Sequence, residues 1–168
     1  MTEGTNRRDF LAIVTGMVAG LGGIAAAIPF INSMLPSRDV EATRTSTIDI
    51  SEVKEGELVT FEWQGKPVFV VHRNKEQIHK AQSTQPSRDP QADKDRVKKP
   101  EWLIVVGICT HLGCIPEFRP EGDRMLLCPC HGSIYDYSAR IIAGPAPKNL
   151  EVPVYKFESD TKVLIGEA

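Results

Sequence analysis

The sequence predicts an all-β domain of short antiparallel strands, preceded by one N-terminal transmembrane helix. Two observations support this fold class: residues 10 to 35 contain no charged side chain, and short runs rich in β-branched and aromatic residues recur from residue 47 onward. All four cysteines and two of the four histidines lie in two short stretches, which we expect to form loops at one end of the β domain. The near-neutral balance of 20 basic and 22 acidic residues gives no indication of nucleic-acid binding.

The N-terminal region is predicted to be a single-pass membrane anchor. At 1.5 Å per residue, a helix over residues 10 to 35 reaches about 39 Å, which is enough to cross a bilayer core of about 30 Å with some tilt. Arg7 and Arg8 precede this stretch, and no basic residue lies within it. The positive-inside rule therefore places residues 1 to 9 in the cytoplasm and the following domain in the periplasm, on the inner membrane of a bacterium.

The same region could also act as an export signal or a cleaved signal peptide, and it contains a candidate helix-packing motif. Arg7-Arg8-Asp9-Phe10-Leu11 is similar to a twin-arginine export signal, which we favour over an ordinary positive flank. A cleaved signal peptide could end at the alanines of residues 25 to 27, but the uncharged stretch continues past them and favours a retained anchor. Gly16 and Gly20 have the spacing of a helix-packing motif, or belong to an anchor that is merely rich in glycine.

Residues 36 to 46 are polar, lack an apolar period and are predicted to be a flexible hinge linker. The β domain is expected to occupy residues 47 to 168. Gln64 and Gly65 lie between two strand patterns and predict a hairpin turn. Strands are predicted at residues 47–50, 58–63, 67–72, 102–107, 124–127, 138–142, 151–157 and 162–165.

Residues 74 to 101 interrupt the strand pattern. Asn74 is expected to cap a short helix, and the polar, charged residues from 82 to 99 predict an exposed insertion. His79 lies in this insertion and is expected to be solvated. His72 is expected to be a surface or packing residue at a strand end.

The two cysteine-rich stretches are C-T-H-L-G-C, from Cys109 to Cys114, and C-P-C-H-G-S, from Cys128 to Ser133. Each offers a cysteine and a histidine to one metal site. Structural zinc sites usually take separate cysteine and histidine pairs, and six donors are two too many for one tetrahedral ion. Two disulfides with incidental histidines would leave both histidines unexplained. An iron–sulfur centre with mixed ligands accounts better for these residue types.

These motifs resemble those of the Rieske family, C-x-H-x-G-C followed by C-x-C-H-G-S, and the likeness extends to Tyr135, Asp136 and the G-P-A-P run at residues 144 to 147. The resemblance implies a Rieske-type antiparallel β domain that holds one [2Fe–2S] cluster. It assigns ligands to the two irons in pairs and a disulfide to the remaining cysteines: Cys109 with Cys128, His111 with His131, and Cys114 with Cys130. Two neutral imidazoles make the cluster less negative, so its potential rises to roughly −150 to +300 mV, against about −400 mV for all-cysteine clusters of the plant type.

In the Rieske family this second pair of cysteines is typical of the subunits of cytochrome bc complexes, so the chain resembles most the Rieske subunit of a bacterial ubiquinol–cytochrome c reductase. Soluble Rieske ferredoxins and oxygenase components usually lack this pair. An oxygenase also needs a second iron held by two histidines and a carboxylate, and only His72 and His79 remain to supply them.

The resemblance further implies the role and the partners of the chain. It would accept an electron from quinol and pass it to a c-type haem, with His131 and His111 contacting the quinol and coupling a proton. It would work with a cytochrome b subunit and a c-type cytochrome subunit, within a dimeric complex in the membrane. Ser133 and Tyr135 would donate hydrogen bonds to cluster sulfurs. The other residues expected around the cluster are Leu112, Gly132, Pro145 and Pro147.

The alternative is a membrane-tethered Rieske electron-transfer protein that serves another reductase or oxidase. Its anchor and its cluster motifs would look the same.

Overall fold

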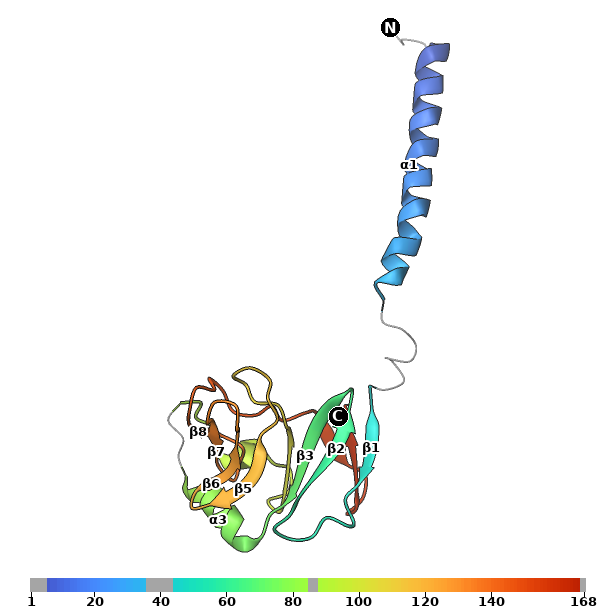
Figure 1. Cartoon of the computed structure of the whole chain (residues 1–168). Helices are drawn as coiled ribbons and strands as arrows, with labels where there is room; N and C mark the ends of the chain where they lie inside the picture. The colour runs from blue at the N-terminus through green and yellow to red at the C-terminus, as the bar shows by residue number, and fades with distance from the viewer. Residues whose placement is uncertain (1–5, 36–43, 85–87, 167–168) are drawn as a thin grey trace. The chain divides into compact units, whose positions relative to one another are not determined.

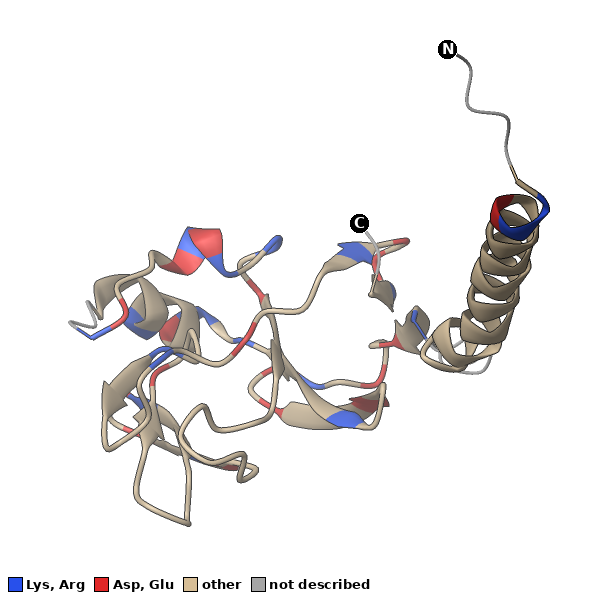
Figure 2. Ribbon diagram, turned by 90° about the horizontal axis from the view of Figure 1, so that it is seen from above, with Lys and Arg blue, Asp and Glu red and all other residues tan. Residues whose placement is uncertain are grey.

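The uncharged N-terminal stretch forms a single helix, α1, from Arg7 to Ser33, with Pro29 inside it. The computed structural model describes residues 6–35, 44–84 and 88–166. The chain divides between residues 41 and 42 into two compact units. α1 is long and apolar enough to cross a membrane. Its charged residues are confined to its first turn, as Figure 2 shows. The predicted helix is confirmed, while residues 1–5 and the linker residues 36–43 lie outside the described residues.

The second unit begins with two three-stranded antiparallel sheets (Figure 1). The first has the order β1–β10–β9, and the second has the order β2–β3–β4. Ser46 already belongs to β1, one residue before the predicted start of the β domain. The strand bounds are β1 Ser46–Asp49, β2 Leu58–Trp63, β3 Lys66–His72, β4 Trp102–Val106, β9 Tyr155–Phe157 and β10 Lys162–Ile165.

Strands β3 and β4 are buried on both faces and separate two apolar cores. Along β3, Val68 and Val70 belong to one core, whereas Phe69 and Val71 belong to the other. Strand β4 alternates in the same way, because successive side chains of a strand point to opposite faces. One core lies against β9 and β10, and the other includes the thiols of Cys109 and Cys128. The strand that leads into the first cysteine loop is thus fixed from both sides.

A third sheet carries the cysteine motifs in its connections. It is antiparallel, with the order β5–β6–β7–β8. The first motif lies between β4 and β5, and the second lies between β6 and β7. Figure 1 shows this sheet beside β3, with the short helix α3 near it. The bounds are β5 Glu117–Glu121, β6 Arg124–Leu127, β7 Ile134–Tyr135 and β8 Ile141–Ala143.

Several sequence predictions are confirmed in this unit. Gln64 and Gly65 both have positive φ, 51° and 70°, as a two-residue hairpin turn between β2 and β3 requires. Helix α3 spans Lys75–Ser83 and begins with a capping box: the Gln77 amide donates to Asn74 Oδ1 at 2.8 Å, and the Asn74 amide donates to Gln77 Oε1 at 3.0 Å. His79 is exposed, and His72 stacks on Trp102 with ring centroids 4.1 Å apart.

Apart from single-residue differences at strand ends, the structure differs from the prediction at four strands. The sequence did not predict β5, a largely exposed edge strand that contains Pro120, or β7, which has only two residues. The strand predicted at 138–142 lies at 141–143, because residues 136–140 form a turn in which Ala139 has a φ of 56°. The strand predicted from residue 151 begins at Tyr155.

The prediction of an exposed insertion was wrong for two of its charged residues. Asp93 and Arg96 are buried, around the short 3₁₀ helix η1, Asp93–Asp95. Arg73 Nη1 donates to Asp93 Oδ1 at 2.7 Å and to the carbonyl oxygen of Tyr137 at 3.1 Å. Arg96 donates to the carbonyl oxygens of Ser138 at 2.7 Å and Leu150 at 2.6 Å. Because these partners are mostly backbone oxygens from distant segments, the charge pattern gave no sign of them.

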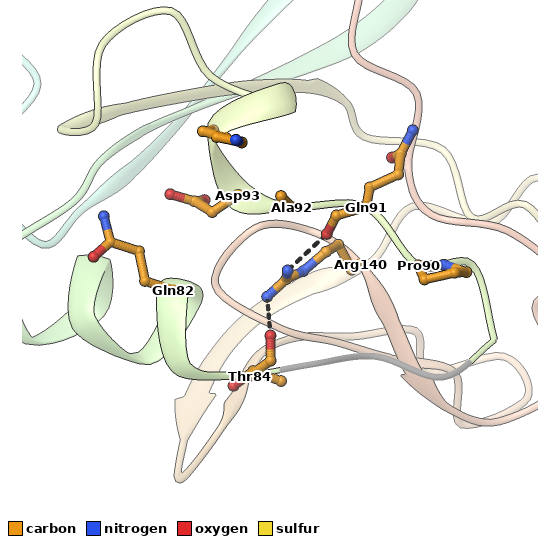
Figure 3. Close-up of a pocket in the computed structure, with 8 residues that line it drawn as sticks. Gln82, Thr84, Pro90, Gln91, Ala92, Asp93 and Arg140 are labelled. Carbon is orange, nitrogen blue, oxygen red and sulfur yellow. Dashed lines mark hydrogen bonds between the residues drawn. The ribbon is translucent and has the colours of Figure 1, made fainter.

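A third arginine joins the insertion to the turn that follows β7. Arg140 Nη2 donates to the carbonyl oxygen of Thr84 at 2.9 Å, and Nη1 donates to that of Gln91 at 2.8 Å (Figure 3). Its Nε donates to Asp136 Oδ2 at 2.7 Å. Thr84, Gln91 and Arg140 border a cavity of about 520 Å³. The residues that line this cavity include none from the two cysteine motifs. The guanidinium of Arg140 at this cavity thus binds carbonyl oxygens of the protein's own backbone.

The buried Arg73–Asp93 pair yields the first prediction. Asp93→Ala leaves a buried guanidinium without its carboxylate, and breaking a buried ion pair in this way typically costs about 3–5 kcal/mol. We expect a markedly lower unfolding midpoint of the full chain, measured by circular dichroism in detergent. Asp160→Ala is the control, because Asp160 pairs with Lys99 at the surface. Equal midpoints for the two variants would contradict the structural role of the buried pair.

Candidate metal centre

The first cysteine loop is a six-residue turn closed by two backbone hydrogen bonds. The Cys109 amide donates to the carbonyl oxygen of Cys114 at 2.8 Å, and the Gly113 amide donates to that of Cys109 at 2.9 Å. Gly113 has a φ of 82°, a conformation that favours glycine. The glycine of the motif therefore serves the backbone, and the residues between it and Cys109 are presented outward.

The second cysteine loop repeats this backbone design. The Cys128 amide donates to the carbonyl oxygen of Ser133 at 2.8 Å, and the Gly132 amide donates to that of Cys128 at 3.0 Å. Gly132 has a φ of 73°. Both loops thus place a cysteine at the first position and a left-handed glycine at the fifth. The histidines occupy different positions, the third in one loop and the fourth in the other.

A disulfide links the two loops. Cys114 and Cys130, separated by 16 positions, form the bond that the Rieske resemblance implied. The sulfur atoms of Cys114, Cys128 and Cys130 all lie within 4.8 Å of one another. Two of these three sulfurs are bonded to each other and are not available as thiolates. Within the described residues the free thiols are Cys109 and Cys128.

The four candidate ligands are divided between the inside and the outside of the domain. The thiols of Cys109 and Cys128 are buried, with residue exposures of 2% and 1%. His111 is half-buried and His131 is exposed, and their ring centroids lie 4.7 Å apart in an edge-to-face arrangement. In the described part of the chain, His111 Nδ1 is a buried nitrogen without a hydrogen-bond partner. An unsatisfied imidazole nitrogen beside two free thiols is the donor set of a metal centre.

Hydrogen bonds surround the thiol of Cys109. The hydroxyl of Tyr135 donates to Cys109 Sγ at 3.2 Å and accepts from the Thr110 amide at 3.4 Å. Burial acts to raise the pKa of the Cys109 thiol, but hydrogen bonds from Tyr135 and the backbone of His111 outweigh it and hold this pKa below its ordinary value. Burial raises the pKa of the Cys128 thiol, and the neighbouring Cys109 thiol adds to this effect. Burial also raises the pKa of Tyr135, so its hydroxyl stays protonated and remains a donor.

A third loop, residues 144–147, packs directly on the second cysteine loop. The Ala146 amide donates to Ser133 Oγ at 3.1 Å. Gly144 has a φ of 95°, and a Cβ atom there would lie 2.5 Å from Ser133 Cα and 2.7 Å from the carbonyl oxygen of Gly132. A side chain at position 144 would therefore displace this loop. Pro145 and Pro147, which flank Ala146, are exposed.

Apolar side chains are exposed on and beside the cysteine loops. Leu112, between His111 and Gly113, is 71% exposed. Ile115 follows the first motif directly and is 56% exposed, and Ile142 in β8 is 37% exposed. Sequence reasoning missed both isoleucines, although the position of Ile115 next to the motif was an available signal. It also missed Thr110, whose hydroxyl donates to the carbonyl oxygen of Lys148 at 2.6 Å.

Comparison with known proteins agrees with this geometry. A family model of the Rieske [2Fe-2S] domain matches residues 44–156, and a model described as the TAT signal of the ubiquinol–cytochrome c reductase Fe-S subunit matches residues 1–37. The iron–sulfur subunit of ubiquinol–cytochrome c reductase from Rhodospirillum rubrum is 47% identical, over 96% of this chain and 92% of the relative. The corresponding subunit from Bradyrhizobium diazoefficiens is 48% identical, over 95% and 94%.

A solved structure is also similar. A chain of a hyperthermophilic respiratory complex III matches with a TM-score of 0.57 and 28% sequence identity, over 90% of this chain and 98% of that one.

The class of protein is therefore a Rieske iron–sulfur protein, with one Rieske-type [2Fe–2S] cluster as its cofactor. Within that class, the chain belongs to the family of iron–sulfur subunits of ubiquinol–cytochrome c reductase, an oxidoreductase complex. The side chains of the structure fit the cofactor. Two free buried thiols, and two imidazoles in edge-to-face contact of which one has an unsatisfied buried nitrogen, lie on the two loops that the disulfide ties together.

The disulfide yields the second prediction. In the chain-entropy model, a crosslink that closes a loop of about 15 residues contributes about 3 kcal/mol. Cys114→Ser, with Cys130→Ser to avoid an unpaired thiol, is expected to lower the unfolding midpoint and to speed the loss of bound iron on dilution. Iron content after timed incubation measures the second effect. Iron retention equal to that of the wild type would show that the crosslink does not hold the loops.

Proposed function

We propose that this chain accepts one electron from ubiquinol and passes it to a c-type haem, as the mobile electron carrier of a cytochrome bc complex. One observation carries the proposal: two buried free thiols and two imidazoles lie on the loops that the disulfide joins, and both His131 and Leu112 are exposed. When bound, the cluster supplies a one-electron acceptor, and in mixed-ligand clusters its potential lies at roughly −150 to +300 mV.

The proposed ligand set divides the two irons between the inner and outer residues. Cys109 and Cys128 would hold the inner iron, and their burial keeps water away from the thiolates. His111 and His131 would hold the outer iron. This arrangement agrees with the burial of the thiols and with the edge-to-face approach of the two rings.

His111 and His131 have a second proposed role. An imidazole that binds a metal through one nitrogen keeps the other available for a proton. Because His131 is exposed, it is the residue that we assign to the contact with the quinol oxygen, with His111 beside it. Both histidines are assigned to proton coupling, and the proton that accompanies the electron would be taken up by the imidazole that contacts the quinol.

The exposed apolar residues near the cluster would dock on the cytochrome b subunit. Leu112 is the principal contact in this proposal, and Pro145 and Pro147 stiffen the third loop beside Ser133 and Gly132. The cytochrome subunits are proposed because the relatives are iron–sulfur subunits of ubiquinol–cytochrome c reductase and a similar chain belongs to a respiratory complex III, and the dimeric assembly is proposed with them. They remain part of the proposal.

The placement in the membrane is proposed as follows. α1 crosses the bacterial inner membrane once, with residues 1–9 in the cytoplasm and the Rieske domain in the periplasm. The match of residues 1–37 to an export signal supports this direction. The hinge predicted at residues 36–46, without Ser46, which belongs to β1, would let the cluster move from the quinol to the haem.

One experiment tests this function as a whole. The tagged full-length chain is purified from membranes in mild detergent and assayed for haem and for cytochrome c reduction by ubiquinol. We expect b-type and c-type haem to co-purify and ubiquinol-dependent reduction to occur. A cluster-loaded chain that brings down neither haem would support a tethered Rieske protein of another reductase or oxidase.

The ligand assignment yields the third prediction. Alanine at Cys109, His111, Cys128 or His131 removes one of the two protein ligands of an iron, so the cluster is expected to be lost. Visible absorbance and iron content of the purified chain measure this loss. His79→Ala is the control, because His79 is exposed on α3. A wild-type spectrum in any ligand variant would refute the role of that residue.

The hydrogen bonds to the cluster yield the fourth prediction. Ser133 and Tyr135 are both buried and carry hydroxyl groups at the site. Such donors stabilise the reduced, more negative cluster, so Ser133→Ala and Tyr135→Phe are expected to lower the midpoint potential with the cluster retained. Redox titration followed by electron paramagnetic resonance measures this. Tyr155→Phe is the control, because it removes a buried hydroxyl from the other core. If both variants had the same midpoint potential as the control, Ser133 and Tyr135 would have a role in packing only.

A further inference from the structure

The insertion reaches the third loop through Arg88. Its Nη1 donates to the carbonyl oxygen of Gly144 and, at 3.2 Å, to that of Ala146. These two carbonyls lie on either side of Pro145. One guanidinium thus joins both ends of the short segment that packs on the second cysteine loop.

Asp89 joins the insertion to Asn149, two residues after the third loop. Its Oδ2 accepts from the backbone amide of Asn149 at 2.9 Å, and its carbonyl oxygen accepts from Asn149 Nδ2, also at 2.9 Å. Asn149 is buried, and its Oδ1 accepts from the Ile141 amide at 2.9 Å. Asn149 therefore ties the chain just after the third loop to the insertion through Asp89, and to β8 at the edge of the third sheet through Ile141.

The inner side of the third loop determines the direction of one hydroxyl group. The Ala146 amide donates to Ser133 Oγ, so this oxygen already accepts one hydrogen bond. The hydroxyl hydrogen of Ser133 remains free to be donated elsewhere. Because the backbone at Gly144 crowds Ser133 and Gly132, a small movement of the loop would rotate or release that hydroxyl.

We propose that Arg88 and Asp89 are positioning residues that hold the third loop so that the Ser133 hydroxyl points at the cluster. This pair, which we call the brace, would raise the redox potential without touching the cofactor. The proposal rests on the role of Ser133 proposed above and extends it to an exposed segment about 45 residues earlier in the chain. It also gives the insertion a function in tuning electron transfer.

Opposite charges within the brace make a sharp test possible. If the two side chains acted on the cluster by charge alone, Arg88→Gln would lower the potential and Asp89→Ala would raise it. If they act by positioning Ser133, both substitutions lower the potential, each by less than Ser133→Ala does.

The experiment is a redox titration of the full-length, cluster-loaded protein, followed by electron paramagnetic resonance. Arg88→Gln and Asp89→Ala are each measured alone and combined with Ser133→Ala. We expect both to lower the potential in the wild-type background and to have little further effect once Ser133 is alanine. Asp95→Ala is the matched control, because Asp95 is an exposed carboxylate of the same insertion whose side chain makes no hydrogen bond in the described part of the chain.

Three outcomes would overturn the proposal. Shifts of opposite sign for Arg88→Gln and Asp89→Ala would show a charge effect, and shifts that persist undiminished beside Ser133→Ala would show a route other than Ser133. A lowered potential in Ser133→Ala with none in the brace variants would overturn the brace alone. An unchanged potential in Ser133→Ala itself would instead refute the tuning role on which the brace rests.

Discussion

The disulfide between Cys114 and Cys130 is the constraint on which the rest of the site depends. The two cysteine loops have the same backbone hydrogen bonds, yet they begin after strands of two different sheets, β4 and β6. The covalent link brings together two half-sites, each with one thiol and one imidazole. The remaining donors differ in burial, because both thiols are buried whereas His111 is half-buried and His131 is exposed.

The surrounding fold supports the loops from beneath and from the side. Strand β4 is buried on both faces and leads into the first loop, so the position of Cys109 is set by two cores. The buried arginines at positions 73, 96 and 140 bind backbone carbonyls across the insertion and the turn after β7. Tyr135 lies at the start of that turn, and its hydroxyl reaches Cys109. The polar network therefore extends from the insertion to the ligand region.

The sequence predicted the parts of this arrangement that depend on local pattern. The motifs gave the four donors and, through the family resemblance, the disulfide, while β-branched runs gave the longer strands. The buried roles of Asp93 and Arg96 could not be predicted, because most of their partners lie between 20 and 54 residues away and are partly main-chain atoms. Strand β5 carries Glu117, Arg119 and Pro120 on an exposed edge, so it lacks the apolar alternation by which strands are recognised.

The central claim is that two thiolates and two imidazoles of these loops bind one [2Fe–2S] cluster. The most direct measurement is pulsed electron paramagnetic resonance on the reduced full-length protein, prepared with ¹⁵N-labelled histidine. The account predicts a paramagnetic cluster coupled to two histidine nitrogens, with both couplings changing on isotope substitution. A colourless zinc protein, or a [2Fe–2S] signal without histidine nitrogen coupling, would contradict it.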